Sequence, residues 1–99
     1  PLILVTGATG TIGSAVVRAL VRAGVPVAAA VRDPARAREL LPSGVELRTF
    51  DWGAEAGFAG VLDGIRRVFL LGPPLEPSLD RLLAPFVSEL ERRGLERLV

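Results

Sequence analysis

The chain contains no lysine, histidine, cysteine, tyrosine or methionine, and all 12 of its basic residues are arginine. Because cysteine and histidine are both absent, disulfide bonds, thiol catalysis and the usual zinc sites are excluded. The absence of lysine excludes the phosphate loop of nucleoside triphosphatases, which requires a Gly-Lys pair followed by serine or threonine. Of the common proton-transferring side chains only Asp and Glu remain, so we expect no catalytic residue and no metal site within these 99 residues.

An excess of charge of one sign is also lacking, because 12 basic residues stand against 11 acidic ones and give a net charge of +1. No run of like charges is present, so we expect neither nucleic acid nor a membrane surface as a partner. No apolar run reaches the length of a membrane-spanning helix, and the first residues do not have the pattern of a secretion signal. We therefore expect a cytoplasmic protein, and 99 residues with 49% hydrophobic content predict one globular domain.

Short apolar segments alternate with segments of helical periodicity along the whole chain. This alternation predicts an α/β fold, namely a Rossmann-like, doubly wound parallel sheet covered by helices on both faces in three αβα layers. We expect strands at residues 2–5, 25–31, 45–50 and 67–71, and helices at residues 11–23, 34–41, 54–62 and 78–93. A fifth strand-like run starts at Leu95 and stops at Val99, so we expect these residues to be the N-terminal part of a longer protein.

Two of these segments are rich in alanine. The second strand contains three consecutive alanines, which are poor strand formers, so its assignment depends on its place in the alternation. In the segment after the glycines, apolar residues recur at spacings of three and four, which predicts a helix. The recurring residues are Ile12, Ala15, Val16, Ala19, Leu20 and Ala23.

Three glycines, Gly7, Gly10 and Gly13, join the first strand to the first helix. The position suits a phosphate cradle, in which one glycine allows a tight turn, one lets a phosphate approach the backbone, and one allows close packing of the helix. Amide groups at the start of the helix then point at an anion. The donors of such a cradle would include Thr9, Thr11 and Ile12. A glycine-rich turn without a ligand is the alternative interpretation.

The segments TGATGTIG after LILV, AAAVRDP, RTFDW and VFLLGPP resemble those of atypical short-chain dehydrogenases/reductases of the NmrA-like group. That group includes quinone reductases and isoflavone-reductase-like enzymes. The resemblance covers essentially the whole chain and implies that residues 1–99 form an NAD(P)-binding Rossmann domain whose substrate-shaping part lies elsewhere. Within this domain the pyrophosphate would be held by the glycine turn, at Gly7, Thr9, Gly10, Thr11, Ile12 and Gly13.

Arg32 and Asp33 follow the second strand, about 20 residues after the glycine turn, where dinucleotide-binding folds read the ribose. The resemblance implies that Arg32 contacts the 2′-phosphate of NADP, whereas Asp33 would suit the 2′-hydroxyl of NAD. Asp33 precedes Pro34 and is equally suited to cap a helix, and Arg32 could be a solvated surface charge. We favour NADP over NAD as the cofactor.

The ends of the third and fourth strands complete the implied site. The resemblance places Asp51 near the adenine amino group with Trp52 beside it, although Trp52 could instead anchor a loop or the core. It also places Leu71, Gly72 and Pro73 beside the nicotinamide ribose. Because LLGPP replaces the Asn-Asn-Ala-Gly stretch of many short-chain dehydrogenases, a polar element of their active site is missing here.

The resemblance implies an NAD(P)H-dependent oxidoreductase that reduces a quinone, carbonyl or similar small acceptor. Two alternatives use the same glycine turn. One is a regulatory protein that senses NAD(P) without turnover, and the other is a sugar-nucleotide epimerase. The tyrosine and lysine of typical short-chain dehydrogenases do not occur in these 99 residues, so the chain itself does not decide between these functions.

Overall fold

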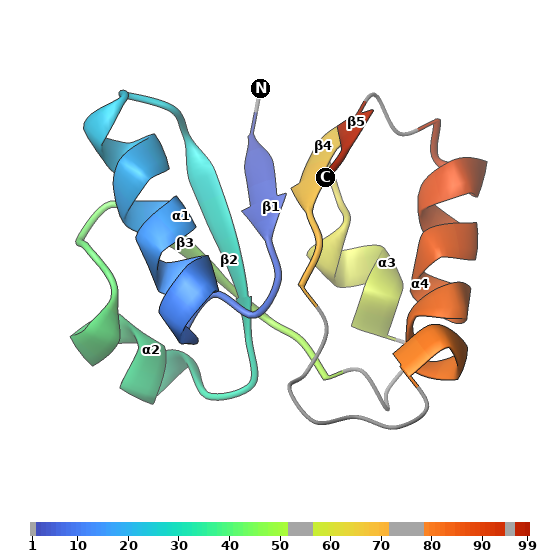
Figure 1. Cartoon of the computed structure of the whole chain (residues 1–99), viewed down its shortest axis with the longest axis horizontal. Coiled ribbons are helices and arrows are strands. Elements are labelled where there is room, and N and C mark those ends of the chain that lie inside the picture. The colour runs from blue at the N-terminus through green and yellow to red at the C-terminus, as the bar shows by residue number, and fades with distance from the viewer. Residues whose placement is uncertain (1, 52–56, 72–78, 95–96) are drawn as a thin grey trace.

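The computed structural model describes residues 2–51, 57–71, 79–94 and 97–99. Strands and helices alternate through these residues (Figure 1). The elements are β1 (Ile3–Val5), α1 (Thr11–Arg22), β2 (Val27–Val31), α2 (Pro34–Leu40), β3 (Glu46–Thr49), α3 (Phe58–Val61), β4 (Arg67–Phe69), α4 (Leu79–Arg92) and β5 (Arg97–Leu98). The predicted order of elements is therefore confirmed, and where both ends of a predicted element are described, its ends differ by at most two residues from those of the structure.

The sheet has the strand order β3-β2-β1-β4-β5, and every neighbouring pair is parallel. This confirms the predicted Rossmann-like, doubly wound architecture. The chain builds outward from β1 to β3 and then returns to place β4 on the other side of β1. The point where the direction of building reverses lies beside β1, and parallel sheets bind ligands at the carboxyl ends of the strands near such a point.

The two faces of the sheet carry two separate apolar cores. Side chains alternate across a strand, so the neighbouring residues Leu4 and Val5 of β1 enter opposite cores. Helices α1 and α2 supply Val17 and Ala37 to one core. Helices α3 and α4 supply residues such as Phe86 to the other. Figure 1 shows the two pairs of helices apart, with the sheet between them. The three-layer arrangement follows from this division.

Strand β2 is buried along its entire length in spite of its alanines. It lies between β1 and β3, and both of its faces are covered by the two cores. Small side chains are suited to this position because helices approach it from both sides. The strand assignment is confirmed, and tertiary packing rather than intrinsic propensity explains it.

Three phenylalanines form the centre of the core under α3 and α4. The rings of Phe50, Phe58 and Phe86 lie 5.3 to 5.5 Å apart between centroids, in tilted and edge-to-face arrangements. These separations are those of favourable aromatic pairs. Phe50 follows β3, Phe58 begins α3 and Phe86 lies in α4, so the cluster joins three elements that are distant in sequence.

The apolar periodicity of α1 correctly predicts a helix, and two of its recurring residues, Val16 and Leu20, pack against the core under α1 and α2. Ile12, Ala15 and Ala19 are exposed, whereas Gly13 and Val17 are the buried residues of α1. Alanine and glycine fit either side of a helix, so the spacing of apolar residues did not define the face.

The predicted helix at residues 54–62 corresponds to the shorter α3, and residues 54–56 lie outside the described residues. Among the described residues no helix is long and apolar enough to cross a membrane. In the same part of the chain, no three acidic side chains form a group that could hold a metal ion.

Candidate dinucleotide-binding site

The turn between β1 and α1 lies at the carboxyl edge of the sheet, where α1 begins (Figure 1). Gly7 has φ +61°, a conformation that L side chains rarely adopt, and a Cβ atom there would lie 3.1 Å from Cβ of Leu71. The amide of Gly10 donates to the carbonyl of Gly7 at 3.1 Å and closes the turn. The expected tight turn at Gly7 is therefore present.

Gly13 is required by the turn itself. A Cβ atom at Gly13 would lie 1.9 Å from the carbonyl oxygen of Gly7 and 2.6 Å from its carbonyl carbon. The expected close packing at Gly13 is present. In the usual description of this motif the third glycine lets the helix pack on the sheet, whereas here Gly13 packs on the backbone of the turn. The first turn of α1 thus sits directly on the peptide that follows β1.

Gly10 differs from the other two glycines because the protein leaves room around it. The nearest atom to a Cβ built there is the Gly7 carbonyl oxygen, at 3.4 Å, and Gly10 is exposed. Its backbone is extended, with φ −79° and ψ 177°, which any residue adopts. Packing within the described chain therefore does not explain the glycine, whereas a phosphate approaching the backbone would.

The N-terminus of α1 is open to an anion. Gly10 is its N-cap and offers no side-chain acceptor, and the first turn contains no acidic residue. The first amides of a helix have no acceptor within the helix, and the helix dipole adds partial positive charge at this end. Thr11 and Ile12 in this turn are exposed, Ile12 by 63%. Together with the space over Gly10, this arrangement fits a pyrophosphate group.

Thr6, which the sequence analysis did not assign a role, connects the glycine turn to the end of β4. Its side chain is fully buried. The hydroxyl accepts a hydrogen bond from the amide of Leu71 at 2.7 Å and donates to the carbonyl of Leu71 at 2.9 Å. The hydroxyl therefore sets the spacing between the glycine turn and the segment that starts at Leu71.

A second part of the site lies after β2, where an open pocket of about 510 Å³ is lined by residues of the glycine turn, β2 and α2. Arg32 and Asp33 line this pocket as the ribose assignment requires, and Thr9 reaches it from the turn. Arg36, which was not predicted, supplies a second guanidinium group. The sequence feature that could have identified Arg36 is its position four residues after Arg32, near the predicted ribose site. The lining residues are Thr9, Val31, Arg32, Asp33, Arg36, Ala37 and Leu40.

Asp33 is the N-cap of α2. Its Oδ1 atom accepts a hydrogen bond from the amide of Arg36 at 3.2 Å, and Pro34 occupies the first position of the helix. The alternative interpretation of Asp33 as a capping residue is confirmed, and it is compatible with the position of Asp33 in the pocket.

The remaining predicted residues lie after β3 and β4. The amide of Phe50 donates to the carbonyl of Val31 at 2.8 Å, so Asp51 and Arg32 leave neighbouring strands at the same edge. Asp51 is exposed but does not line the 510 Å³ pocket. Leu71 is half-buried beside Gly7. Trp52, Gly72 and Pro73 lie outside the described residues.

Known proteins resemble this chain in sequence. The model of the NmrA-like family matches residues 1–81. The chain is 39% identical over 98 residues to the NAD(P)H azoreductase of Xenophilus azovorans. This alignment covers 99% of this chain and 34% of the azoreductase. It is 37% identical over 73 residues to quinone oxidoreductase 2 of Escherichia coli, and this alignment covers 71% of this chain and 25% of the oxidoreductase.

Solved structures resemble it in fold. The NADPH-dependent quinone oxidoreductase of Escherichia coli, solved in complex with NADPH, matches 97% of this chain and 35% of its own with a TM-score of 0.84 and 28% identity. The triphenylmethane reductase of Citrobacter sp., solved in complex with NADP(H), gives a TM-score of 0.81 and 27% identity, with coverage of 97% and 35%. The chain thus spans about a third of these relatives, and it belongs to the NmrA-like family, a group of atypical short-chain dehydrogenases/reductases.

Proposed function

We propose that this chain is the NADP(H)-binding part of a reductase that passes hydride from the nicotinamide to a small acceptor such as a quinone, azo or carbonyl compound. The observation that carries the proposal is the open N-terminus of α1 over Gly10, next to a pocket with two arginines at the same edge of the sheet. The names of its relatives, which include an azoreductase and quinone oxidoreductases, support the class of reaction.

In this proposal the glycine turn and the start of α1 hold the pyrophosphate. Backbone amides donate hydrogen bonds to its oxygens, and the absence of a side chain at Gly10 lets the phosphate reach them. The hydroxyl groups of the two threonines add donors. The residues assigned to this role are Gly7, Thr9, Gly10, Thr11, Ile12 and Gly13.

We assign NADP rather than NAD on the charges of the ribose pocket. Arg32 and Arg36 both line it, and guanidinium groups bind phosphate through paired, charge-assisted hydrogen bonds. Asp33 is the acidic residue that would favour the 2′-hydroxyl of NAD, but its carboxylate caps α2 through the amide of Arg36. The two arginines, together with a carboxylate that already accepts a hydrogen bond from the helix, favour the 2′-phosphate of NADP over the 2′-hydroxyl of NAD.

The ends of β3 and β4 are assigned to the adenine and to the nicotinamide ribose. Asp51 and Trp52 are assigned to the adenine, and Leu71, Gly72 and Pro73 to the nicotinamide ribose. The bound dinucleotide would supply the hydride, while residues of this chain bind and orient it. The chain has no tyrosine, histidine or lysine to protonate the reduced acceptor, and in this proposal the proton comes from water or from another donor at the substrate site.

The cofactor assignment is tested by replacing the pocket arginines. Arg32→Ala is expected to weaken NADPH binding by about 10-fold to 100-fold, because charge-assisted hydrogen bonds to the 2′-phosphate are lost. NADH binding should change by less than about twofold. Arg22→Ala, which removes an exposed arginine from the last turn of α1, is the matched control and should change neither affinity. The measurement is calorimetric titration with each dinucleotide.

Equal losses of NADPH and NADH affinity would contradict the assignment of NADP, and absence of binding to either dinucleotide would refute the proposed function. Turnover separates the reductase from a non-catalytic sensor. NADPH oxidation with a panel of quinone, azo and carbonyl compounds should proceed for a reductase, whereas a sensor would bind NADPH without consuming it.

A further inference from the structure

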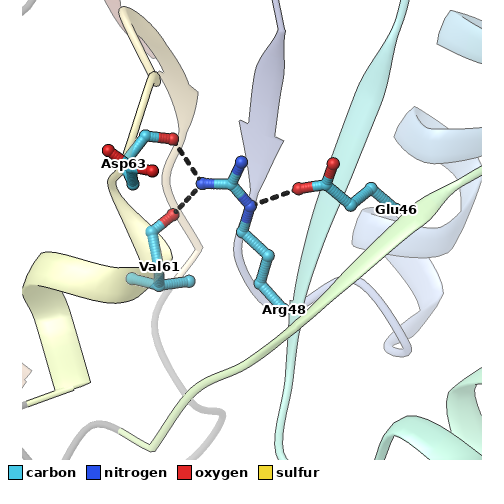
Figure 2. Close-up of polar contacts among 4 residues, drawn as sticks. All are labelled: Glu46, Arg48, Val61 and Asp63. Atoms are coloured by element: carbon cyan, nitrogen blue, oxygen red, sulfur yellow. Dashed lines mark hydrogen bonds and ion pairs between the residues drawn. The ribbon is translucent and has the colours of Figure 1, made fainter.

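Arg48 in β3 is tied to the end of α3 by a set of polar contacts (Figure 2). One terminal nitrogen of its guanidinium donates to the carbonyl of Val61 at 3.0 Å and to the carbonyl of Asp63 at 2.6 Å. Its Nε atom donates to Oε2 of Glu46 at 2.5 Å. The Arg48 side chain is 18% exposed, and its contact with Val61 is partly buried, whereas its contacts with Asp63 and Glu46 are exposed.

The carbonyl contacts hold α3 against the strand. The last carbonyls of a helix have no amide partner within the helix, and Arg48 supplies donors to two carbonyls at the end of α3. The ion pair with Glu46, whose side chain is 52% exposed, contributes little by itself but orients the guanidinium. The contacts therefore form a clamp between β3 and the C-terminal end of α3.

The N-terminal end of α3 is held to the same strand by aromatic packing. The ring of Phe58 lies 5.5 Å from the ring of Phe50, measured between centroids. Phe50 lies two residues after Arg48, immediately beyond β3, and belongs to the core under α3 and α4. Asp51 and Gly57 are thus each next in the chain to a phenylalanine of this pair.

We infer that Arg48 is a positioning residue for the adenine end of the dinucleotide site. This inference rests on the proposed function, in which Asp51 binds the adenine amino group. Arg48 lies three residues before Asp51, about 10 Å along an extended strand, so it acts through the backbone and not by contact with the cofactor. The clamp holds the strand from which the chain leads to Asp51, and in this way it contributes to the position of the Asp51 carboxylate.

The experiment compares adenosine 2′,5′-bisphosphate with purine riboside 2′,5′-bisphosphate, which lacks the amino group. Binding is followed through the fluorescence of Trp52, the only tryptophan of the chain. The protein as it stands is expected to prefer the adenosine compound. Arg48→Met should weaken the adenosine compound by about threefold to tenfold, the contribution of one hydrogen bond, and change the purine riboside compound by less than about twofold.

Arg93→Met is the matched control, because Arg93 donates to Glu89 at 3.0 Å near the end of α4 and lies far along the chain from β3. It should leave the preference for adenosine unchanged. Arg48→Lys keeps a cation that can reach a carbonyl but loses the planar fork, and it should give an intermediate loss. Should Arg48→Met fail to fold, Arg48→Lys decides the question in the same assay.

Equal losses for both ligands, or an unchanged preference for adenosine in the Arg48 variants, would overturn the inference. A parent protein that binds both ligands equally would overturn it as well, because adenine recognition by Asp51 would then be absent. A parent protein that binds neither ligand would instead refute the proposed dinucleotide site, so the two failures are distinguishable.

Discussion

Gly13→Ala is the substitution that the glycine turn tolerates least. The new Cβ atom would lie 1.9 Å from the carbonyl oxygen of Gly7, a backbone atom that cannot rotate away. Helix and turn would have to separate by about 1 Å to reach even the shortest distance seen in folded proteins. Overpacking of this kind costs up to about 3 kcal/mol. Alanine regains about 1 kcal/mol through its higher helix propensity, so the expected net loss of unfolding free energy is about 2 kcal/mol.

Thermal unfolding followed by circular dichroism measures this loss. For a domain of this size, about 2 kcal/mol corresponds to a fall in Tm of about 8 to 16 °C. Gly60→Ala is the matched control, because Gly60 also lies in a helix but a Cβ atom there meets nothing within 4 Å. That variant should be as stable as the parent or more stable. A Gly13→Ala protein with a Tm equal to that of the parent would refute the steric reasoning.

The remaining predictions concern a buried hydroxyl and a surface carboxylate. Thr6→Val removes the hydroxyl that bonds both the amide and the carbonyl of Leu71, which should lower the free energy of unfolding measured in urea by about 1 to 3 kcal/mol. Thr49→Val, at an exposed site of β3, is its control, and equal effects of the two substitutions would contradict the role of Thr6. Hydrogen bonds from the guanidinium groups of Arg92 and Arg93 hold the pKa of the Glu89 carboxyl below its ordinary value of 4.5. A lowered pKa in the folded state stabilises the fold above the ordinary value, and this stabilisation is lost as pH falls through the folded pKa. Urea midpoints between about pH 6 and about pH 3 should therefore fall less steeply for Glu89→Gln, and an unchanged slope would contradict the assignment.

The sequence predicted the fold well because its information was local and repeated. Most strands were short apolar runs, β3 was an alternating segment, and each helix was followed within three residues by a glycine or proline, so the order of elements was visible without any long-range contact. Even the alanines of β2 were assigned correctly from their place in that order. The face of α1 could not be assigned in the same way, since its alanines satisfy either rotation and only the contact of Gly13 with Gly7 decides between them.

The candidate site was predictable where a residue acts through its own backbone and not where it acts through a distant partner. Because a turn is a local feature, the tight turn at Gly7 and the close packing at Gly13 were both predicted, although the predicted packing of Gly13 was against the sheet and its contact is the backbone of Gly7. The partner of Thr6 lies 65 residues later, and Arg48 bonds carbonyls 13 and 15 residues away. Such contacts leave no periodic signal in one sequence.

The contact between Gly13 and Gly7 has a thermodynamic consequence for ligand binding. Because the first turn of α1 rests on the peptide after β1, the amide donors of the candidate pyrophosphate site are ordered before any ligand arrives. Binding there should not require a segment to fold, so little conformational entropy is lost at this end of the ligand. The heat-capacity change on binding would then report the apolar surface buried by the two bases and carry almost no contribution from the glycine turn.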